Sequence, residues 1–169
     1  WFVQKTIIRT LGLLQKKETA SVLFEYLKSD EWVVSHTAYQ SLIPLGETIV
    51  DRVLEQLEET NDSVRYFIPK LLGEIKSPRA ISALENEIRN ENDPVRLAIL
   101  VEAAGKIDAE SFYEMLLPLT ESDNWMVRYR TFQALGPTMA ERDPEKLHQA
   151  SEDNNWHVRT AVKLILSAL

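Results

Sequence analysis

Residues 123–136 read DNWMVRYRTFQALG, and the same pattern returns 31 residues later as NNWHVR at 154–159. Valine anchors at about this spacing run through the whole chain: Val3, Val34, Val64, Val95, Val127 and Val158. A glycine follows nine or ten residues after four of these anchors. An internal period of this length is typical of stacked supersecondary units. The sequence therefore predicts a repeat architecture.

Each period contains two amphipathic helical patterns. The apolar residues after each anchor recur at helical spacing, as in the third unit with Ile68, Leu71, Leu72 and Ile75. We name these segments the anchor helices, and we expect polar caps before them at Asp62, Asp93, Asn124 and Asn155. We expect the second helix of each pair at 19–29, 47–59, 79–90, 109–121 and 144–152. Strand patterns are absent from the sequence.

A helix pair of this kind cannot bury its apolar stripe alone, so stacked pairs share one continuous core. We expect an all-α fold, namely an α-solenoid of about five to six stacked helix pairs in a right-handed superhelix. Residues 1–169 are interpreted as one continuous array. Because the chain opens inside a motif, we expect it to be a fragment of a longer protein. Pro69 lies inside an anchor helix, where it should produce a kink.

The signature D-x-x-V-R-x-x-A-x-x-x-L-G resembles the short HEAT-like repeats of the phycobilisome-lyase type. It is clearest in NDPVRLAILVEAAGKI (92–107), NDSVRYFIPKLLGEI (61–75) and DNWMVRYRTFQALG (123–136). Gln4 and Ser35 depart from it, because each replaces the arginine. The resemblance implies that the anchor helices line the concave face. It implies little about activity, since function resides in sites added to such a scaffold.

Positions two residues before an anchor and two and six residues after it lie on one ridge of an anchor helix, away from the buried valine. With the anchor helices on the concave face, this ridge would carry polar and aromatic side chains suited to a partner. We name them the concave ridge: Lys5, Arg9, His36, Gln40, Tyr66, Lys70, Tyr129 and Gln133. The sequence predicts that the concave ridge binds a peptide or protein whose identity it does not give.

Every tryptophan stands two residues before an anchor: Trp1, Trp32, Trp125 and Trp156. One interpretation is structural, with each indole covering a helix start in the manner of a hydrophobic staple. The alternatives are a partly exposed indole that serves both packing and binding, and a dedicated binding stripe. Recurrence at a fixed position favours packing, and the sequence leaves the exposure of these rings open.

Four anchors are followed by an arginine: Arg65, Arg96, Arg128 and Arg159. The resemblance implies that each pairs with an acidic residue near the start of a neighbouring anchor helix, for which Asp62, Asp93 and Asp123 are available. We name this set the structural ladder. Glu102 is unusual, because it is a carboxylate on the core stripe of its helix. It is expected to reach a ladder arginine such as Arg128, and a functional role is the alternative.

Composition narrows the possible functions. The net charge is −7, which does not favour a long nucleic-acid footprint, although positive charges gather in the anchor helices. There is no cysteine, and His36, His148 and His157 show no metal-ligand spacing. No apolar run approaches a membrane span of roughly 20 residues, and no signal peptide opens the chain, so we expect a cytoplasmic protein.

The main prediction from the sequence is a non-enzymatic interaction module, because no catalytic motif, cofactor motif or metal motif is found. Protein partners are expected, and exposed end repeats could also let the isolated chain self-associate. One alternative, suggested by the repeat type, is a bilin-lyase-like protein that handles a linear tetrapyrrole. A second alternative is a HEAT-like DNA-repair glycosylase, which would require a strongly basic groove with an exposed tryptophan beside a carboxylate.

Overall fold

A computed structural model describes residues 1–57 and 61–168, and the side chains of 62 and 63 lie outside that description. Its contacts group the chain into two compact units, Trp1–Ala80 (unit 1) and Ile81–Leu169 (unit 2). The residues described form helices and turns without strands, which confirms the all-α fold class. None of the described helices combines the length and the apolar character that a bilayer crossing needs.

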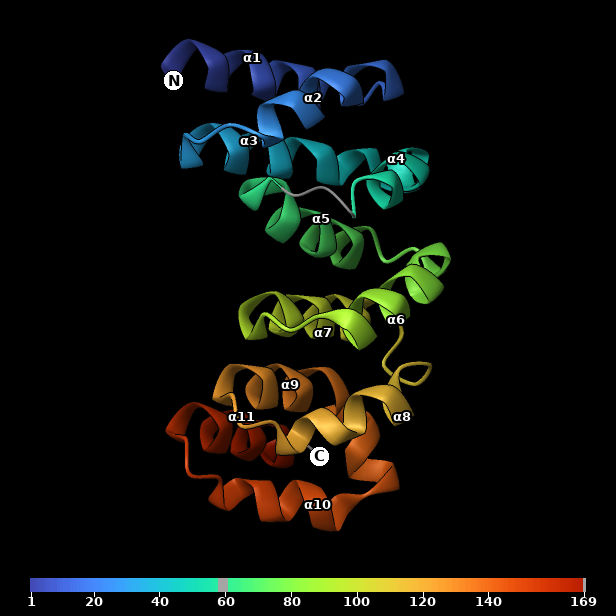
Figure 1. The fold of residues 1–169 in the computed structure, drawn as a ribbon, viewed down its shortest axis with the longest axis vertical. Helices are drawn as coiled ribbons and strands as arrows, with labels where there is room; N and C mark the ends of the chain where they lie inside the picture. Colours follow the sequence, from blue (N-terminus) through green and yellow to red (C-terminus); the bar gives the residue numbers. More distant parts are fainter. Residues whose placement is uncertain (58–60, 169) are drawn as a thin grey trace. The chain divides into compact units, whose positions relative to one another are not determined.

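Unit 1 contains three anchor helices: α1 (Phe2–Leu13), α3 (Trp32–Leu42) and α5 (Asp62–Ile75). Between them lie α2 (Ala20–Leu27) and α4 (Val50–Glu55), each preceded by 3₁₀ turns, at Lys17–Thr19 and Ile43–Ile49. Helix α3 packs against α1 and also contacts α5 (Figure 1). The 3₁₀ segment before α4 turns at Gly46, whose positive φ of 52° favours glycine.

Unit 2 repeats this arrangement with the anchor helices α7 (Pro94–Asp108), α9 (Trp125–Arg142) and α11 (Trp156–Ser167). The second helices are α6 (Ile81–Asn90), α8 (Tyr113–Leu116) and α10 (Pro144–Gln149). The 3₁₀ turns Leu117–Glu121 and Ala150–Glu152 extend α8 and α10, and Pro78–Ala80 forms a third turn at the end of unit 1. Helix α9 lies between α7 and α11 (Figure 1).

The anchor valines occupy the core in four of the six repeats: Val34, Val64, Val127 and Val158. Val3 and Val95 are instead 68% and 43% exposed, so the expectation that every anchor is buried is wrong. Val3 lies on a side of α1 that is away from the contacts with α2 and α3, together with exposed Phe2 and Leu13. The repeat position alone therefore does not decide burial.

Asparagine and aspartate side chains begin the anchor helices. Asp93, Asn124 and Asn155 each accept a hydrogen bond from a backbone N–H in the first turn of their helix. The cap of α5 is Asn61, which accepts from Val64 N, so the cap lies one residue earlier than predicted. Helix α5 continues through the buried Pro69, and its carboxyl end is closed by Lys76 in the left-handed conformation.

The recurring glycine allows neighbouring anchor helices to approach closely. A Cβ placed on Gly12 would lie 2.7 Å from Ser41 Cβ, and one on Gly105 would lie 2.4 Å from Ala134 Cβ. Gly136 is enclosed in the same way by the side chain of Ile165. These glycines set the spacing of α1 on α3, α7 on α9 and α9 on α11.

Candidate functional site

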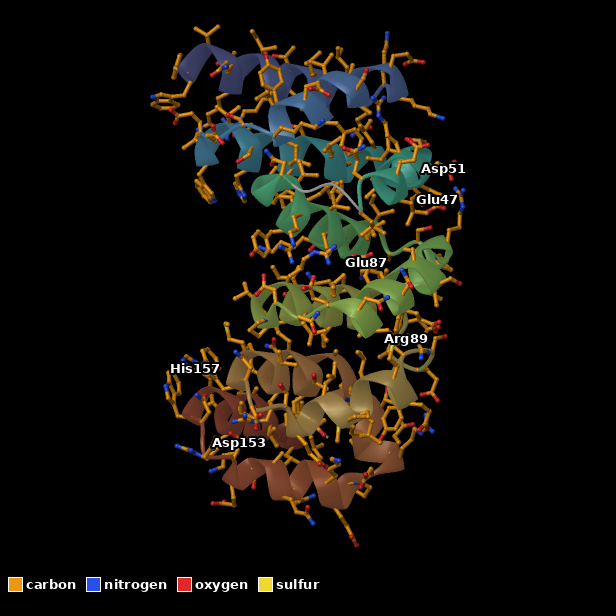
Figure 2. The ribbon with its side chains drawn as sticks, viewed as in Figure 1. Glu47, Asp51, Glu87, Arg89, Asp153 and His157 are labelled. Atoms are coloured by element: carbon orange, nitrogen blue, oxygen red, sulfur yellow. The ribbon has the colours of Figure 1, made fainter. Side chains whose placement is uncertain are left out.

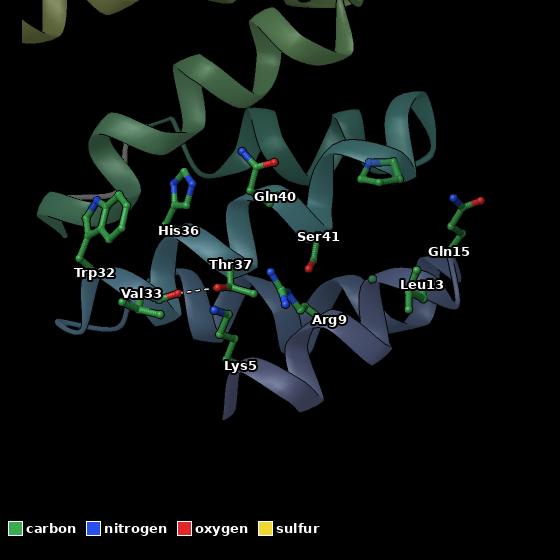
Figure 3. Close-up of a pocket in the computed structure, with 12 residues that line it drawn as sticks. Lys5, Arg9, Leu13, Gln15, Trp32, Val33, His36, Thr37, Gln40 and Ser41 are labelled. Atoms are coloured by element: carbon green, nitrogen blue, oxygen red, sulfur yellow. Dashed lines mark hydrogen bonds between the residues drawn. The ribbon is translucent and has the colours of Figure 1, made fainter. Parts of the chain in front are cut away.

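The largest site that we describe is a groove of about 790 Å³ between α1 and α3 in unit 1 (Figure 3). We name it the α1–α3 groove. Its lining residues are Lys5, Arg9, Gly12, Leu13, Gln15, Trp32, Val33, His36, Thr37, Gln40, Ser41 and Pro44. Four concave-ridge residues predicted from the sequence meet here: Lys5, Arg9, His36 and Gln40. Trp32, which precedes His36 by one turn on the same ridge, also lines the groove, and its exposure was left open by the sequence.

A stacked aromatic pair forms one wall of the α1–α3 groove. The rings of Trp32 and His36 lie one helical turn apart on α3, with centroids 4.7 Å apart and planes inclined by 8°. His36 is supported by Tyr39 and Phe67, at centroid distances of 5.9 and 6.2 Å. The indole of Trp32 is 67% exposed. His36 covers one face of the Trp32 indole, and the exposed remainder of the indole offers an apolar surface that a second planar ring could cover.

Two cations from α1 also line the groove. Lys5 and Arg9 are also one helical turn apart, and their side chains extend from α1 toward α3 (Figure 3). No Asp or Glu is among the residues that line the groove. Among the described residues, neither Lys5 nor Arg9 forms an ion pair with a carboxylate. The groove therefore combines an aromatic wall with uncompensated positive charge.

Unit 2 contains the corresponding groove between α7 and α9, with a volume of about 290 Å³. We name it the α7–α9 groove, and its lining residues are Glu102, Gly105, Lys106, Arg130, Gln133 and Ala134. Gly105 and Ala134 correspond to Gly12 and Ser41, since both pairs make the close helix contact. Counted back from these glycines, Glu102 takes the place that Arg9 has in unit 1.

Glu102 is half-buried at this groove, so its expected place in the core is wrong. Its carboxylate lies 2.7 Å from Lys106 Nζ and 3.3 Å from Arg130 Nη1, whereas Arg128 was the expected partner. The reason is register, because α7 has one residue more between its anchor and its glycine than α1 or α9. That insertion rotates Glu102 from the core stripe toward the groove.

A second aromatic cluster lies at the starts of α9 and α11. His157 is stacked between two indoles, with centroid distances of 4.8 Å to Trp125 and 3.7 Å to Trp156. Tyr129 meets His157 edge-on at 6.4 Å and accepts a hydrogen bond from Gln133. His157 has no counterpart among the predicted ridge residues. It directly precedes an anchor valine, a position that the sequence reasoning did not consider.

The tryptophans are exposed rather than packed as staples. Trp1, Trp32 and Trp156 are 63%, 67% and 59% exposed, and Trp125 is 36% exposed. The packing interpretation that the sequence favoured is therefore wrong for Trp1, Trp32 and Trp156, whereas Trp125 is partly covered by His157 of the neighbouring anchor helix. On the concave ridge, Tyr66 and Lys70 are half-buried on α5 and do not line the α1–α3 groove.

The structural ladder is present, but the acidic residues that pair with its arginines differ from those predicted. Arg128 makes a two-pronged contact with Asp153, at 2.8 Å from Nε and 2.9 Å from Nη2, and Arg159 Nη1 donates to the carbonyl of Asp153. Asp153 precedes α11, so it is the acidic residue near the next helix start (Figure 2). Asp123 contributes only its backbone carbonyl to Arg128.

Arg96 binds Glu87 and Glu91 of its own repeat, while Asp93 caps α7. Burial opposes the charge on Arg96, but hydrogen bonds to Glu91 and Glu87 outweigh it and raise the pKa of the guanidinium. Arg65 is half-buried, and the carboxylate of Asp62 lies outside the described residues. These arginines are occupied within the fold.

No family model matches the chain. The chain is 28% identical over 125 residues to the bilin biosynthesis protein RpcF of Synechococcus sp. (strain WH8020), a match that spans 69% of the chain. It spans only 60% of the length of that relative. Among solved structures, the complex of CpcE and CpcF of phycocyanin lyase from Nostoc sp. PCC7120 is similar, with a TM-score of 0.76. That match has 19% identity and covers 89% of this chain and 99% of the other, so it supports the α-solenoid fold.

These similarities correct the functional prediction made from the sequence. The main prediction was a non-enzymatic interaction scaffold, and it is contradicted by relatives named for bilin biosynthesis and for a phycocyanin lyase. The prediction that the chain is no enzyme is contradicted by the same relatives. They favour the bilin-lyase alternative instead.

Proposed function

We propose that this chain is a bilin-handling subunit of a lyase and that the α1–α3 groove binds a linear tetrapyrrole. The observation that carries the proposal is the exposed Trp32–His36 stack inside a groove of about 790 Å³. This volume is within the roughly 300–1,000 Å³ of typical small-molecule pockets. The similarity to RpcF supplies the chemical class of the ligand.

The chemistry of a linear tetrapyrrole suits the two walls of this groove. Its conjugated pyrrole rings are flat and apolar on their faces, so they can stack on the indole of Trp32. The imidazole of His36 lies directly beside that surface, and its ring nitrogens can donate or accept a hydrogen bond. The amide of Gln40, one turn further along α3, can hydrogen-bond the polar edge of a ring.

We propose further that the complete activity requires a protein partner. The similar solved structure is a complex of two proteins, which supports this proposal without identifying the partner of this chain. The match also spans only part of the length of RpcF. We therefore do not assign the groups that complete the reaction to residues of the described site.

An absorbance titration with biliverdin, a linear tetrapyrrole, tests ligand binding. We expect a saturable change in the biliverdin spectrum with the wild-type chain, and about fivefold weaker binding for Trp32→Ala, because one aromatic stacking contact contributes about 1 kcal/mol. Trp156→Ala is the matched control, since Trp156 is similarly exposed and also stacks on a histidine. Equal weakening by both variants, or no saturable change with the wild type, would contradict the proposal.

A further inference from the structure

We infer that Lys5 and Arg9 bind the two carboxylates of the tetrapyrrole and so fix its orientation in the α1–α3 groove. This inference rests on the proposed function and adds to it which edge of the ligand faces which helix. A linear tetrapyrrole of the biliverdin type carries two propionate side chains on its central rings. The carboxylate edge would face α1, and the ring faces would lie against Trp32 and His36 on α3.

The spacing of the two cations matches a ligand with two anionic arms. Lys5 and Arg9 are at i and i+4 on α1, so their Cβ atoms are neighbours at about 5–6 Å and their long side chains can diverge. Arg9 can form two parallel hydrogen bonds to one carboxylate, while Lys5 offers a compact ammonium to the other. Both extend toward α3 in Figure 3.

Both cations are available to a ligand. In the described residues no carboxylate pairs with either of them, and none lines the groove. Most other arginines near the anchor-helix starts are committed, as Arg128 is to Asp153 and Arg96 to Glu87 and Glu91. The positive charge of the α1–α3 groove is therefore not explained by the packing of the repeats.

In the α7–α9 groove of unit 2, the cations already have a carboxylate partner. There Glu102 replaces Arg9, and its carboxylate already holds Lys106 and Arg130. A dicarboxylate ligand would have to displace Glu102 from both cations. The repeat therefore provides one groove whose two cations have no carboxylate partner, and one in which Glu102 offsets part of the positive charge of Lys106 and Arg130.

Esterification of the ligand separates carboxylate recognition from ring recognition. We titrate the wild-type chain with biliverdin and with biliverdin dimethyl ester, which has the same rings but no charged carboxylate. We expect the ester to bind at least about tenfold more weakly, because a hydrogen bond to a charged group contributes about 1.5–3 kcal/mol. In Lys5→Gln/Arg9→Gln the acid should lose this advantage and bind about as weakly as the ester.

The control is Lys163→Gln on the exposed side of α11, which removes a positive charge far from α1 in sequence and should preserve the preference for the acid. Melting curves confirm that each variant is folded. Equal binding of acid and ester by the wild type, with both weakened by Trp32→Ala, would overturn this inference while the proposed function stands. Failure of both ligands to bind would overturn the two together.

Discussion

A single arginine in α9, Arg128, shows how the repeat holds a charge in place. The Arg128 and Asp153 side chains are only 10% and 12% exposed, and the guanidinium also binds Asn154 and two backbone carbonyls. Burial opposes ionisation of Asp153, but hydrogen bonds from Arg128 and from the backbone of Asn155 outweigh it and lower the pKa of the carboxyl group. Asp153 therefore contributes to stability in its charged form.

Asp153→Asn should lower the free energy of unfolding by about 1.5–3 kcal/mol at neutral pH, as expected for a lost charge-assisted hydrogen bond. The pKa of Asp153 is lower in the folded state, so its contribution is complete above the unfolded value near 3.8. It is lost as the pH falls through the folded value. Urea unfolding between pH 7 and pH 3 should show the difference between wild type and variant shrinking only below about pH 4.

The control for that series is Asp123→Asn. Asp123 is exposed and lies near Arg128 without forming a salt bridge to it among the described contacts. Asp123→Asn should therefore lower the free energy of unfolding by less than Asp153→Asn does. A wild-type-to-variant difference that stays constant down to pH 3 would show that the charge of Asp153 does not carry its contribution.

Individual side-chain environments were the part of the candidate site least accessible to sequence reasoning. The period placed Lys5, Arg9, His36 and Gln40 on one ridge, and the structure brings all four to one groove. The same period assigned the tryptophans to packing, yet they are exposed. A repeat position gives the direction of a side chain from its own helix, but exposure depends on the neighbouring side chains in space.

At the level of helices, the repeat is set by where two anchor helices touch. Gly12, Gly105 and Gly136 all lie at such contacts, and a Cβ at any of them would overlap the next anchor helix. The sequence shows that a glycine recurs nine or ten residues after an anchor, but it does not explain why a glycine is needed there. The structure supplies that reason, and it also explains Glu102, which is shifted by the extra residue in α7.

Gly105→Ala should lower the free energy of unfolding by about 1–3 kcal/mol, because the new methyl group would lie 2.4 Å from Ala134 Cβ. This outcome opposes intrinsic helix propensity, which alone would favour alanine by about 1 kcal/mol. The matched control is Asn86→Ala on the exposed side of α6, where the propensity gain has no such overlap. Stabilisation by Gly105→Ala in thermal or urea unfolding would show that the helix contact is looser than described.

The positions of the helices were predictable to within a few residues. The expected second helix at 47–59 is found as the end of a 3₁₀ segment followed by α4, with residues 58 and 59 outside the described part of the chain. The one expected at 109–121 is found as α8 followed by a 3₁₀ turn. The apolar pattern predicts which residues turn inward, but it does not distinguish a 3₁₀ turn from an α-helix. That difference depends on local hydrogen bonding and on residues such as Pro44 and Pro118.

For the whole chain, the sequence was informative about fold and misleading about function. The 31-residue period predicts an α-solenoid, and the similarity to the CpcE and CpcF complex supports that fold. The absence of a known catalytic motif favoured a scaffold, which the named relatives contradict. A binding groove built from one ridge of each of two helices has no contiguous motif, so a motif search could not find it.

The most direct test is a crystal structure of the chain grown with saturating biliverdin. We predict electron density for one tetrapyrrole in the α1–α3 groove, with a ring against Trp32 and carboxylates at Lys5 and Arg9. We predict none in the α7–α9 groove, where Glu102 already binds both nearby cations. Density for the ligand elsewhere on the chain, with the α1–α3 groove free of it, would contradict the proposal.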